Sequence, residues 1–433
     1  MSHVSDRLTF AGLWTGTSSL QTTPSLVCSS ARSRTQRPVA APPPGLGCRQ
    51  IVWLLACFAG LLLPATARGQ AGYYIRPSAS VAEYYDDNVF RTIDDRQDDA
   101  VSRFGVGAEA GYQSAPFTLL GHYRLESEVY AKHTELTNAL ALQDVGAQAT
   151  YLPTRLWILN FTGGWIETEL PEFINVPSGI LGTRARARNY SLSPSISHLL
   201  DPATTVSALY TFNSTRQVGA VTLESHTARL VVDRRLSERD TLHLGYTFVE
   251  FHSIGRTATG STRNRSELNH IPTVGWSRQL SPLTSFTLDI GPRFASRDRV
   301  TPEVLAVVTR MLQNGILTFS YTRTQYTVAG VGSPVTTDSV ILAWERQLTN
   351  RLMATVKPAF YHNAESQFDA KVYALDVDLF YQINQWLGFR GTYEFTFEKG
   401  SLIRAGTATP TSGDLYRNMV LFELVASYPM RVY

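Results

Sequence analysis

The chain of 433 residues is long for one soluble domain, and 43% of its residues are apolar while only 17% are charged. It contains 20 Tyr, 20 Phe and 7 Trp, a profile unlike that of a helical or disordered chain. Without residues 1–69, which hold six Arg and one Asp, it has 33 basic and 35 acidic residues. A chain this close to neutral gives no electrostatic ground for a nucleic-acid partner.

The N-terminal region is predicted to be a targeting segment. Residues 48–69 have the layout of a signal peptide, with Arg49 before an apolar run of 13 residues and Ala65-Thr66-Ala67 as the cleavage site. A helix of that length spans only about 20 Å, too short for a bilayer core of roughly 30 Å. Residues 1–47 resemble neither a signal nor a domain, and we expect them to be disordered or untranslated. The folded part is therefore predicted at 70–433.

All three cysteines lie in the N-terminal region, at positions 28, 48 and 57. The rest of the chain therefore has neither a disulfide framework nor a thiolate metal site. No cofactor is expected.

From Tyr73 onward the hydrophobic pattern has a period of two residues. In the segments 103–112, 117–129 and 387–398, large apolar side chains alternate with small, polar or charged ones. In a strand these two sets point to opposite faces, so each segment predicts a strand with one apolar and one polar face.

Eighteen such runs follow one another along the chain. They are centred near residues 80, 106, 124, 146, 161, 192, 209, 229, 246, 272, 290, 307, 320, 342, 356, 377, 392 and 423. The connections after even-numbered runs are short, and most of those after odd-numbered runs are longer. This layout predicts an all-β fold: an antiparallel, up-and-down transmembrane β-barrel of about 18 strands in a Gram-negative outer membrane, with short periplasmic turns and longer extracellular loops.

Aromatic residues support the same interpretation, because they gather at the two ends of the predicted strands. One group flanks the short turns: Tyr112, Phe117, Tyr151, Trp157, Trp276, Phe286, Trp344 and Trp386. A second group flanks the loops: Tyr85, Trp165, Phe212, Phe294, Phe360 and Phe397. Two belts of this kind are typical of the two membrane interfaces. The C-terminus departs from the usual pattern, since Arg431 and Pro429 occupy positions expected to be apolar; we predict a bulge at Pro429.

The start of the predicted barrel carries a family resemblance. The segment 75–90, Ile-Arg-Pro-Ser-Ala-Ser-Val-Ala-Glu-Tyr-Tyr-Asp-Asp-Asn-Val-Phe, resembles the opening of the outer-membrane proteins called beta-barrel porin 2, and the strand rhythm extends the resemblance over about 73–433. Related proteins are often associated with exopolysaccharide and exosortase loci. The resemblance implies a role in surface-glycan export or display.

Charged residues on the polar faces are the candidate pore lining. They are Arg103, Glu109, His122, Arg124, Glu126, Glu128, Asp144, Asp289, Arg293, Lys357, Asp376, Asp378, Arg390 and Glu394. A barrel of this size holds water, so the charges need not be paired. Two interpretations stay open: a lining that tunes selectivity, or a solvated interior with cross-strand ion pairs of about 0.2–1 kcal/mol each.

Two loops and one row of arginines contain further candidate residues. The connection 167–183, with Glu167, Glu169 and Glu172, is the candidate constriction loop, and a loop capping the outside is the alternative. The period-two row Arg184, Arg186 and Arg188 is suited to lipopolysaccharide phosphates if it faces outward, and a bulge would turn it inward. The acidic first loop, 86–99, suggests Ca²⁺ binding, but it lacks the spacing of a calcium loop and is better interpreted as a solvated acidic loop.

Two function hypotheses follow for a protein not expected to be an enzyme. His252 and His362 lie near loop bases without a recognisable neighbouring nucleophile. The first hypothesis is a pore for passive passage of small hydrophilic solutes or glycans. The alternative is an accessory or structural barrel for surface-polysaccharide export, closed without its partner. The expected partners are outer-membrane lipid, lipopolysaccharide, the barrel-assembly machinery and polysaccharide-export components.

Overall fold

The structure, a computed structural model, describes residues 72–220, 222–255, 265–296, 299–365, 368–402, 411–428 and 430–432. The extension and signal peptide predicted at 1–47 and 48–69 lie outside these residues. Among the residues it does describe, no helix is long and apolar enough to cross a membrane.

Strands make up most of the described chain. They are β1 (Gly72–Asp86), β2 (Asp99–Gln113), β3 (Phe117–Tyr130), β4 (Asn138–Thr154), β5 (Trp157–Thr168), β6 (Ala187–Asp201), β7 (Thr204–Gln217), β8 (Thr222–Arg235), β9 (Asp240–Ile254), β10 (Arg265–Ser281), β11 (Thr284–Ala295), β12 (Arg299–Leu312), β13 (Gly315–Tyr326), β14 (Val335–Gln347), β15 (Leu352–Glu365), β16 (Phe368–Gln382), β17 (Leu387–Leu402), β18 (Thr411–Ser427) and β19 (Met430–Val432). Two single-turn 3-10 helices, η1 (Thr134–Leu136) and η2 (Pro171–Phe173), lie in loops.

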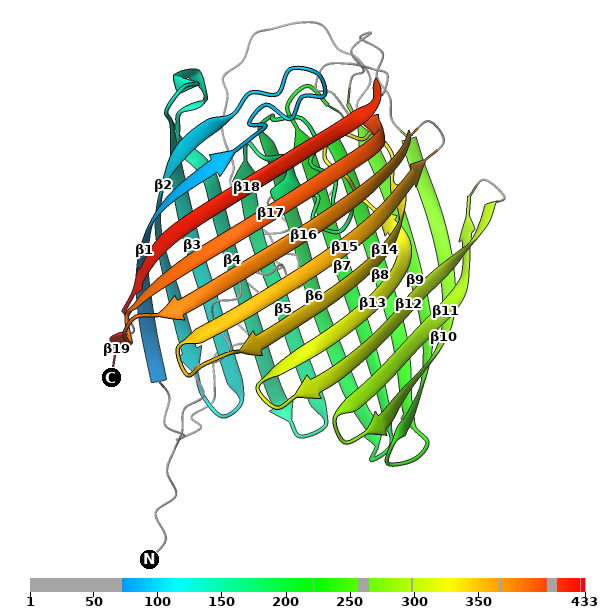
Figure 1. The fold of residues 1–433 in the computed structure, drawn as a ribbon. Coiled ribbons are helices and arrows are strands. Elements are labelled where there is room, and N and C mark those ends of the chain that lie inside the picture. Colours follow the sequence, from blue (N-terminus) through cyan, green and yellow to red (C-terminus); the bar gives the residue numbers. More distant parts are fainter. Residues whose placement is uncertain are drawn as a thin grey trace, which may run out of the picture.

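The first eighteen strands form a closed antiparallel barrel (Figure 1). Each strand pairs with the next along the chain, and β1 pairs with β18 to close the ring. Every predicted run corresponds to one of these strands, so the predicted fold class and strand number are confirmed. A closed ring satisfies every main-chain hydrogen bond along the wall and leaves no open edge, which a membrane requires.

The wall is apolar outside and polar inside, the reverse of a soluble domain. On β8 and β9, for example, Leu230 and Leu244 are 49% and 51% exposed. The predicted aromatic belts appear as contacts between rings on neighbouring strands. Tyr112, Phe117 and Tyr151 form one chain of ring contacts near the short turns. Outward apolar side chains have no protein to cover them, and lipid is the environment that matches them.

The two rims differ in the length of their connections. The connections after even-numbered strands have two to four residues, and the longest connection after an odd-numbered strand is 169–186, between β5 and β6. The strand β18 therefore ends at the short-turn rim, where β19 continues its line and pairs with β1 (Figure 1). Short turns characterise the periplasmic rim of such barrels, so the long loops define the outer rim.

The bulge predicted at Pro429 falls on a residue outside those that the structure describes. Ser427 pairs with Ser78 and Met430 pairs with Ile75, so β18 and β19 pair with β1 in one common register.

Candidate functional site: the charged interior and the loop that crosses it

The charged residues singled out as pore lining share the inward face of the wall. On β2 and β3, Arg103 stands opposite Glu128 and His122 opposite Glu109. The register places all the candidate residues on this face: Arg103, Glu109, His122, Arg124, Glu126, Glu128, Asp144, Asp289, Arg293, Lys357, Asp376, Asp378, Arg390 and Glu394. Their role in solute passage stays a prediction.

Many of these charges are joined in ion pairs between neighbouring strands. Lys357 Nζ lies 2.9 Å from an Asp376 oxygen. Arg390 Nε lies 3.2 Å from Asp378, and its Nη1 lies 3.4 Å from Glu423. These contacts match the second interpretation of the lining, a wall joined by cross-strand ion pairs. They hold the charged side chains of the inner wall in position.

A buried polar cluster lies at the outer end of this face, around Glu128. Arg103 Nη2 donates to Glu128 Oε1 over 2.8 Å, and the Tyr84 hydroxyl donates to the same oxygen over 3.0 Å. The Tyr130 hydroxyl donates to Glu128 Oε2 over 2.8 Å and accepts from Arg184 Nη1 over 2.6 Å. Arg184 belongs to the loop between β5 and β6, so the cluster ties that loop to the inner wall.

The same loop, residues 169–186, reaches the opposite wall from the inside, and we call it the crossing loop. The strand β15 lies halfway round the ring from β6, yet Asn363 Nδ2 on β15 donates to the Ser178 carbonyl over 2.8 Å. Ile180 is fully buried in an apolar cluster that includes Tyr361 of β15. An apolar core within the barrel explains why the loop stays there: Ile180 leaves water only when the loop is docked.

Two more contacts hold the crossing loop along its length. The Ala329 amide, in the β13–β14 connection, donates to Asn175 Oδ1 over 2.8 Å. The Leu181 amide donates to Glu398 of β17 over 3.2 Å. The loop is therefore anchored to the β13–β14 connection, to β15 and to β17, and does not cap the outside.

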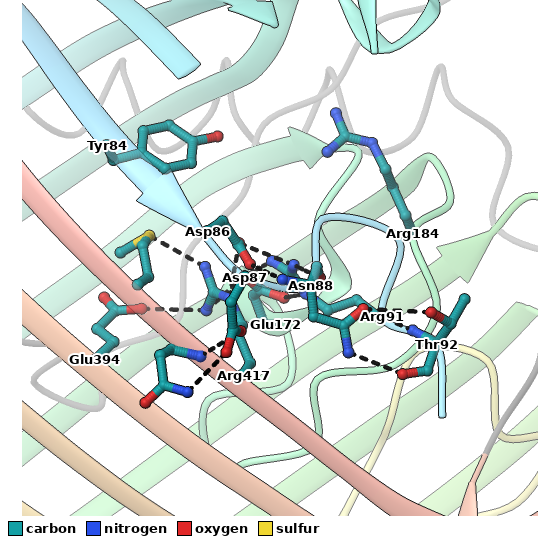
Figure 2. Close-up of polar contacts among 12 residues, drawn as sticks. Tyr84, Asp86, Asp87, Asn88, Arg91, Thr92, Glu172, Arg184, Glu394 and Arg417 are labelled. Atoms are coloured by element: carbon teal, nitrogen blue, oxygen red, sulfur yellow. Dashed lines mark hydrogen bonds and ion pairs between the residues drawn. The ribbon is translucent and has the colours of Figure 1, made fainter. Parts of the chain in front are cut away.

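Its acidic residue Glu172 enters a second buried cluster of charges (Figure 2). Arg91 donates to both Glu172 oxygens over 2.9 and 3.1 Å, and Arg417 Nη1 lies 3.3 Å from Glu172. Arg417 also binds Asp86 over 2.9 Å and Glu394 over 3.2 Å. Arg91 lies 3.0 Å from Asp86. Two cations thus join β1, β17, β18 and the crossing loop.

These contacts set the ionisation of the loop residues. Burial favours the neutral form of Glu172, but Arg91 and Arg417 outweigh it and hold the pKa of Glu172 below its ordinary value. Burial likewise opposes the charge on Arg91, but Asp86 and Glu172 raise its pKa above the ordinary value. Both groups are therefore charged at neutral pH.

The acidic start of the first loop fastens the first strand to the last, and we call it the seam clamp (Asp86, Asp87 and Asn88). Asp87 accepts from the Asn418 main-chain and side-chain nitrogens over 2.7 and 2.8 Å. Asn88 Nδ2 donates to the Tyr416 carbonyl over 3.0 Å. The segment that carries the family resemblance thus contains the residues that close the barrel.

The expectation of a solvated acidic loop is wrong for part of this segment. Asp86, Asn88 and Asp99 are at most 2% exposed, and the side-chain oxygens of each accept a hydrogen bond from a protein donor. Within the described residues, no group of three or more His, Cys, Asp or Glu is arranged to hold a metal ion. The carboxylates there accept from arginine and amide nitrogens.

Two assignments in the loop region need correction. Glu167 is not in the crossing loop: it lies on β5, two residues beyond Trp165 on the outward face, where Arg186 and Arg188 bind it. The arginine row is also split, because Arg184 points inward to Glu169 over 3.1 Å. Of the three acids assigned to the constriction, Glu169 and Glu172 belong to the crossing loop.

The two rim histidines pair with acids. His252 Nε2 lies 3.0 Å from Glu250, and His362 Nε2 lies 3.3 Å from Asp369. Both lie on the outward face, and neither is bonded to a serine or threonine hydroxyl in the contacts described. The arrangement gives no geometry for nucleophilic catalysis.

Sequence reasoning missed Arg91, Arg417 and Glu398 as interior residues. Arg91 has a left-handed backbone, φ 58°, that no spacing rule predicts for arginine. Arg417 and Glu398 follow the inward period of their strands. Counting forward from Glu394 finds Glu398, and counting back from Leu421 finds Arg417.

The comparisons with known proteins identify only distant neighbours. Neither a family model nor a curated protein matches the sequence. Among solved structures, OccAB4 of Acinetobacter baumannii is 9% identical over 84% of this chain and 99% of that one, with a TM-score of 0.44. The siderophore receptor PirA of the same organism is 7% identical over 84% and 81%, with a TM-score of 0.42. The evidence for the barrel topology is therefore the strand pairing of this chain.

The fold and its surface define the class of the protein. A closed antiparallel ring of eighteen strands, with an exposed apolar belt, aromatic side chains at both ends and short turns on one rim, is the architecture of an outer-membrane β-barrel. The chain is such a protein, located in the outer membrane. No match narrows the class to a family, and the link to beta-barrel porin 2 stays a resemblance.

Proposed function

We propose that this barrel is a pore for the passive passage of small hydrophilic solutes or short glycans, narrowed by the crossing loop. One observation carries the proposal: the loop leaves the β5–β6 rim, traverses the interior and binds β15 on the far side. A loop held in that position reduces the cross-section available to a solute, as a selectivity constriction must.

The inner wall near the loop's origin supports hydrophilic solutes. On β6 and β7, Ser193 bonds to Thr211 over 3.1 Å and Ser197 to Ser207 over 2.8 Å. This uncharged wall of hydroxyl groups offers both donors and acceptors to a polar solute. Ion-paired charges lie elsewhere on the inner wall, on β1–β4, β11–β12 and β15–β18, so a solute would meet both hydroxyl groups and paired charges.

A second candidate function is an accessory barrel for surface-polysaccharide export that stays closed without its partner. The buried apolar cluster around Ile180 favours it, because side chains such as Val335 and Val372 pack against the loop as in a plug. A plug of this kind would have to be displaced before a polymer could pass.

Single-channel recording of the refolded protein, residues 70–433, in a planar bilayer separates the two functions. Stable openings with weak ion selectivity are expected for the diffusion pore. A matched variant with residues 171–183 replaced by a short Gly/Ser linker should carry a larger current. If the wild-type barrel is folded but carries no current, and only the loop variant conducts, the result would favour the closed exporter. If both forms conduct equally, the crossing loop is not the constriction.

A further inference from the structure

Three arginines gather on the outward surface at the outer rim of β5–β7. Arg188 on β6 is in register with Glu167 on β5 and with Arg216 on β7. Arg186 lies two residues further toward the rim. The side chains of Arg186 and Arg188 are 50% and 41% exposed, and Arg216 is exposed as well. These side chains face the membrane surroundings, outside the bore.

The height of the group is given by its neighbours on the same face. Trp165 and Tyr190 are in register with each other, two residues closer to the membrane centre than Glu167 and Arg188. Aromatic side chains mark the level of the lipid headgroups. The arginines therefore lie at the outer edge of this level, among the headgroups of the outer leaflet.

The charges of the group do not balance. Glu167 is the acid that both Arg186 and Arg188 contact, and its side chain is only 4% exposed beneath them. It orients the two guanidinium groups while their outer edges stay free for another acceptor. Arg188 and Arg216 are like charges on directly opposite positions of two strands, an arrangement that destabilises a sheet unless an anion lies between them.

We propose that Arg186, Arg188 and Arg216 form a binding site for a phosphate group of an outer-leaflet lipopolysaccharide headgroup. Guanidinium groups bind phosphate oxygens in pairs, and two of these three are already held in position by a buried carboxylate. The phosphate accepts from Arg188 and Arg216 together and removes their repulsion. The site is separate from the bore and does not depend on solute passage.

The test measures retention of lipid by the folded barrel in detergent, with native mass spectrometry as the readout. The probes are a deep-rough lipopolysaccharide, the same lipid after enzymatic dephosphorylation, and inorganic phosphate. Wild-type protein should retain the phosphorylated lipid and lose the dephosphorylated one. Arg188→Gln with Arg216→Gln should weaken retention about tenfold, which corresponds to ~1.4 kcal/mol.

The matched control is Arg278→Gln, an arginine with a side chain 45% exposed beside Trp276 at the short-turn rim. It should retain lipid as wild type does. The single variant Arg216→Gln leaves the contacts of Glu167 intact, so it tests the site even if the double variant fails to fold. Equal retention of both lipids, or equal loss in the control, would overturn the proposal. Displacement of the lipid by inorganic phosphate at comparable concentration would also overturn it, by showing a small-anion site.

Discussion

Three acidic side chains converge on Arg417 inside the barrel. Its side chain is 5% exposed and contacts Asp86, Glu172 and Glu394. Removing one member of a buried ionic cluster leaves the others without compensation, and this costs far more than the cluster contributes as a whole.

We expect Arg417→Gln to lower the free energy of unfolding by roughly 3–5 kcal/mol, the range for breaking a buried ion pair. Urea unfolding in micelles, followed by tryptophan fluorescence, measures the change. Arg96→Gln is the control, because Arg96 is 46% exposed and lies 3.8 Å from Asp87. Its loss should cost about 0–1 kcal/mol. Equal costs for the two variants would mean that the buried cluster does not hold the fold.

Glu172 gives the crossing loop a dependence on pH. A carboxylate whose pKa is lower in the docked state stabilises docking above its ordinary pKa, and that contribution is lost as the pH falls through the lowered value. The ordinary value here is 4.5, and Arg91 and Arg417 hold the pKa of Glu172 below it. We expect the single-channel current to rise on acidification below pH 4.5. Glu172→Gln should already show the larger current at neutral pH. If the current of that variant still rises on acidification as in wild type, a group other than Glu172 causes the pH dependence.

The crossing loop, as an element, depends on one close approach of its main chain to a ring. Gly179 has a positive φ of 67°, and a Cβ built on it would lie 2.4 Å from the Tyr361 ring. Gly219 has a similar φ of 80° with nothing within 4 Å, so it is a matched control for backbone strain alone.

Gly179→Ala should therefore do more than Gly219→Ala. Both substitutions carry the left-handed backbone penalty of about 1–2 kcal/mol, but only the first pushes the loop away from Tyr361. Limited proteolysis of the folded protein should cut the crossing loop faster in Gly179→Ala than in Gly219→Ala. Equal rates of cleavage would argue that Tyr361 does not hold the loop.

The strands were predictable because period two is a strong signal when one face meets lipid and the other meets water. The same period placed the inward residues, since Lys357, Asp376 and Arg390 each continue the polar face of a strand. The same period also predicts that Glu167 lies on the outward face of its strand, because it follows the outward residue Trp165 by two positions. The path of the crossing loop was not predictable, because Ser178 meets Asn363 across the ring and no local pattern encodes that contact.

At the scale of the whole molecule, the ring is closed by one seam between its two ends. In the seam clamp, the Asp87 carboxylate accepts hydrogen bonds from the main-chain and side-chain nitrogens of Asn418, in addition to the strand pairing. Within the described residues, the pairings of β1 with β18 and β19 are the ones that join the start of the barrel to its end.

We expect Asp87→Ala to weaken this seam by about 1–3 kcal/mol, since it leaves the Asn418 side-chain and main-chain donors without their acceptor. The temperature at which the compact form is lost on detergent gels measures the effect. Asp95→Ala, in the same loop, removes only a contact of an exposed side chain with Gln97 and should leave that temperature unchanged. Equal shifts would place the stability of the seam in the strand pairing alone.

The seam clamp also sets when assembly can finish. Asp87 and Asn418 are 331 positions apart, so their bonds cannot form until almost the whole chain has been delivered to the membrane. Contacts between residues this distant in sequence carry a large entropic cost of loop closure, and they form slowly. A barrel that lacks its last strand would leave the Asp87 carboxylate without its Asn418 donors. Arrival of the last strand is thus the step that completes the ring and gives Asp87 its hydrogen-bond donors.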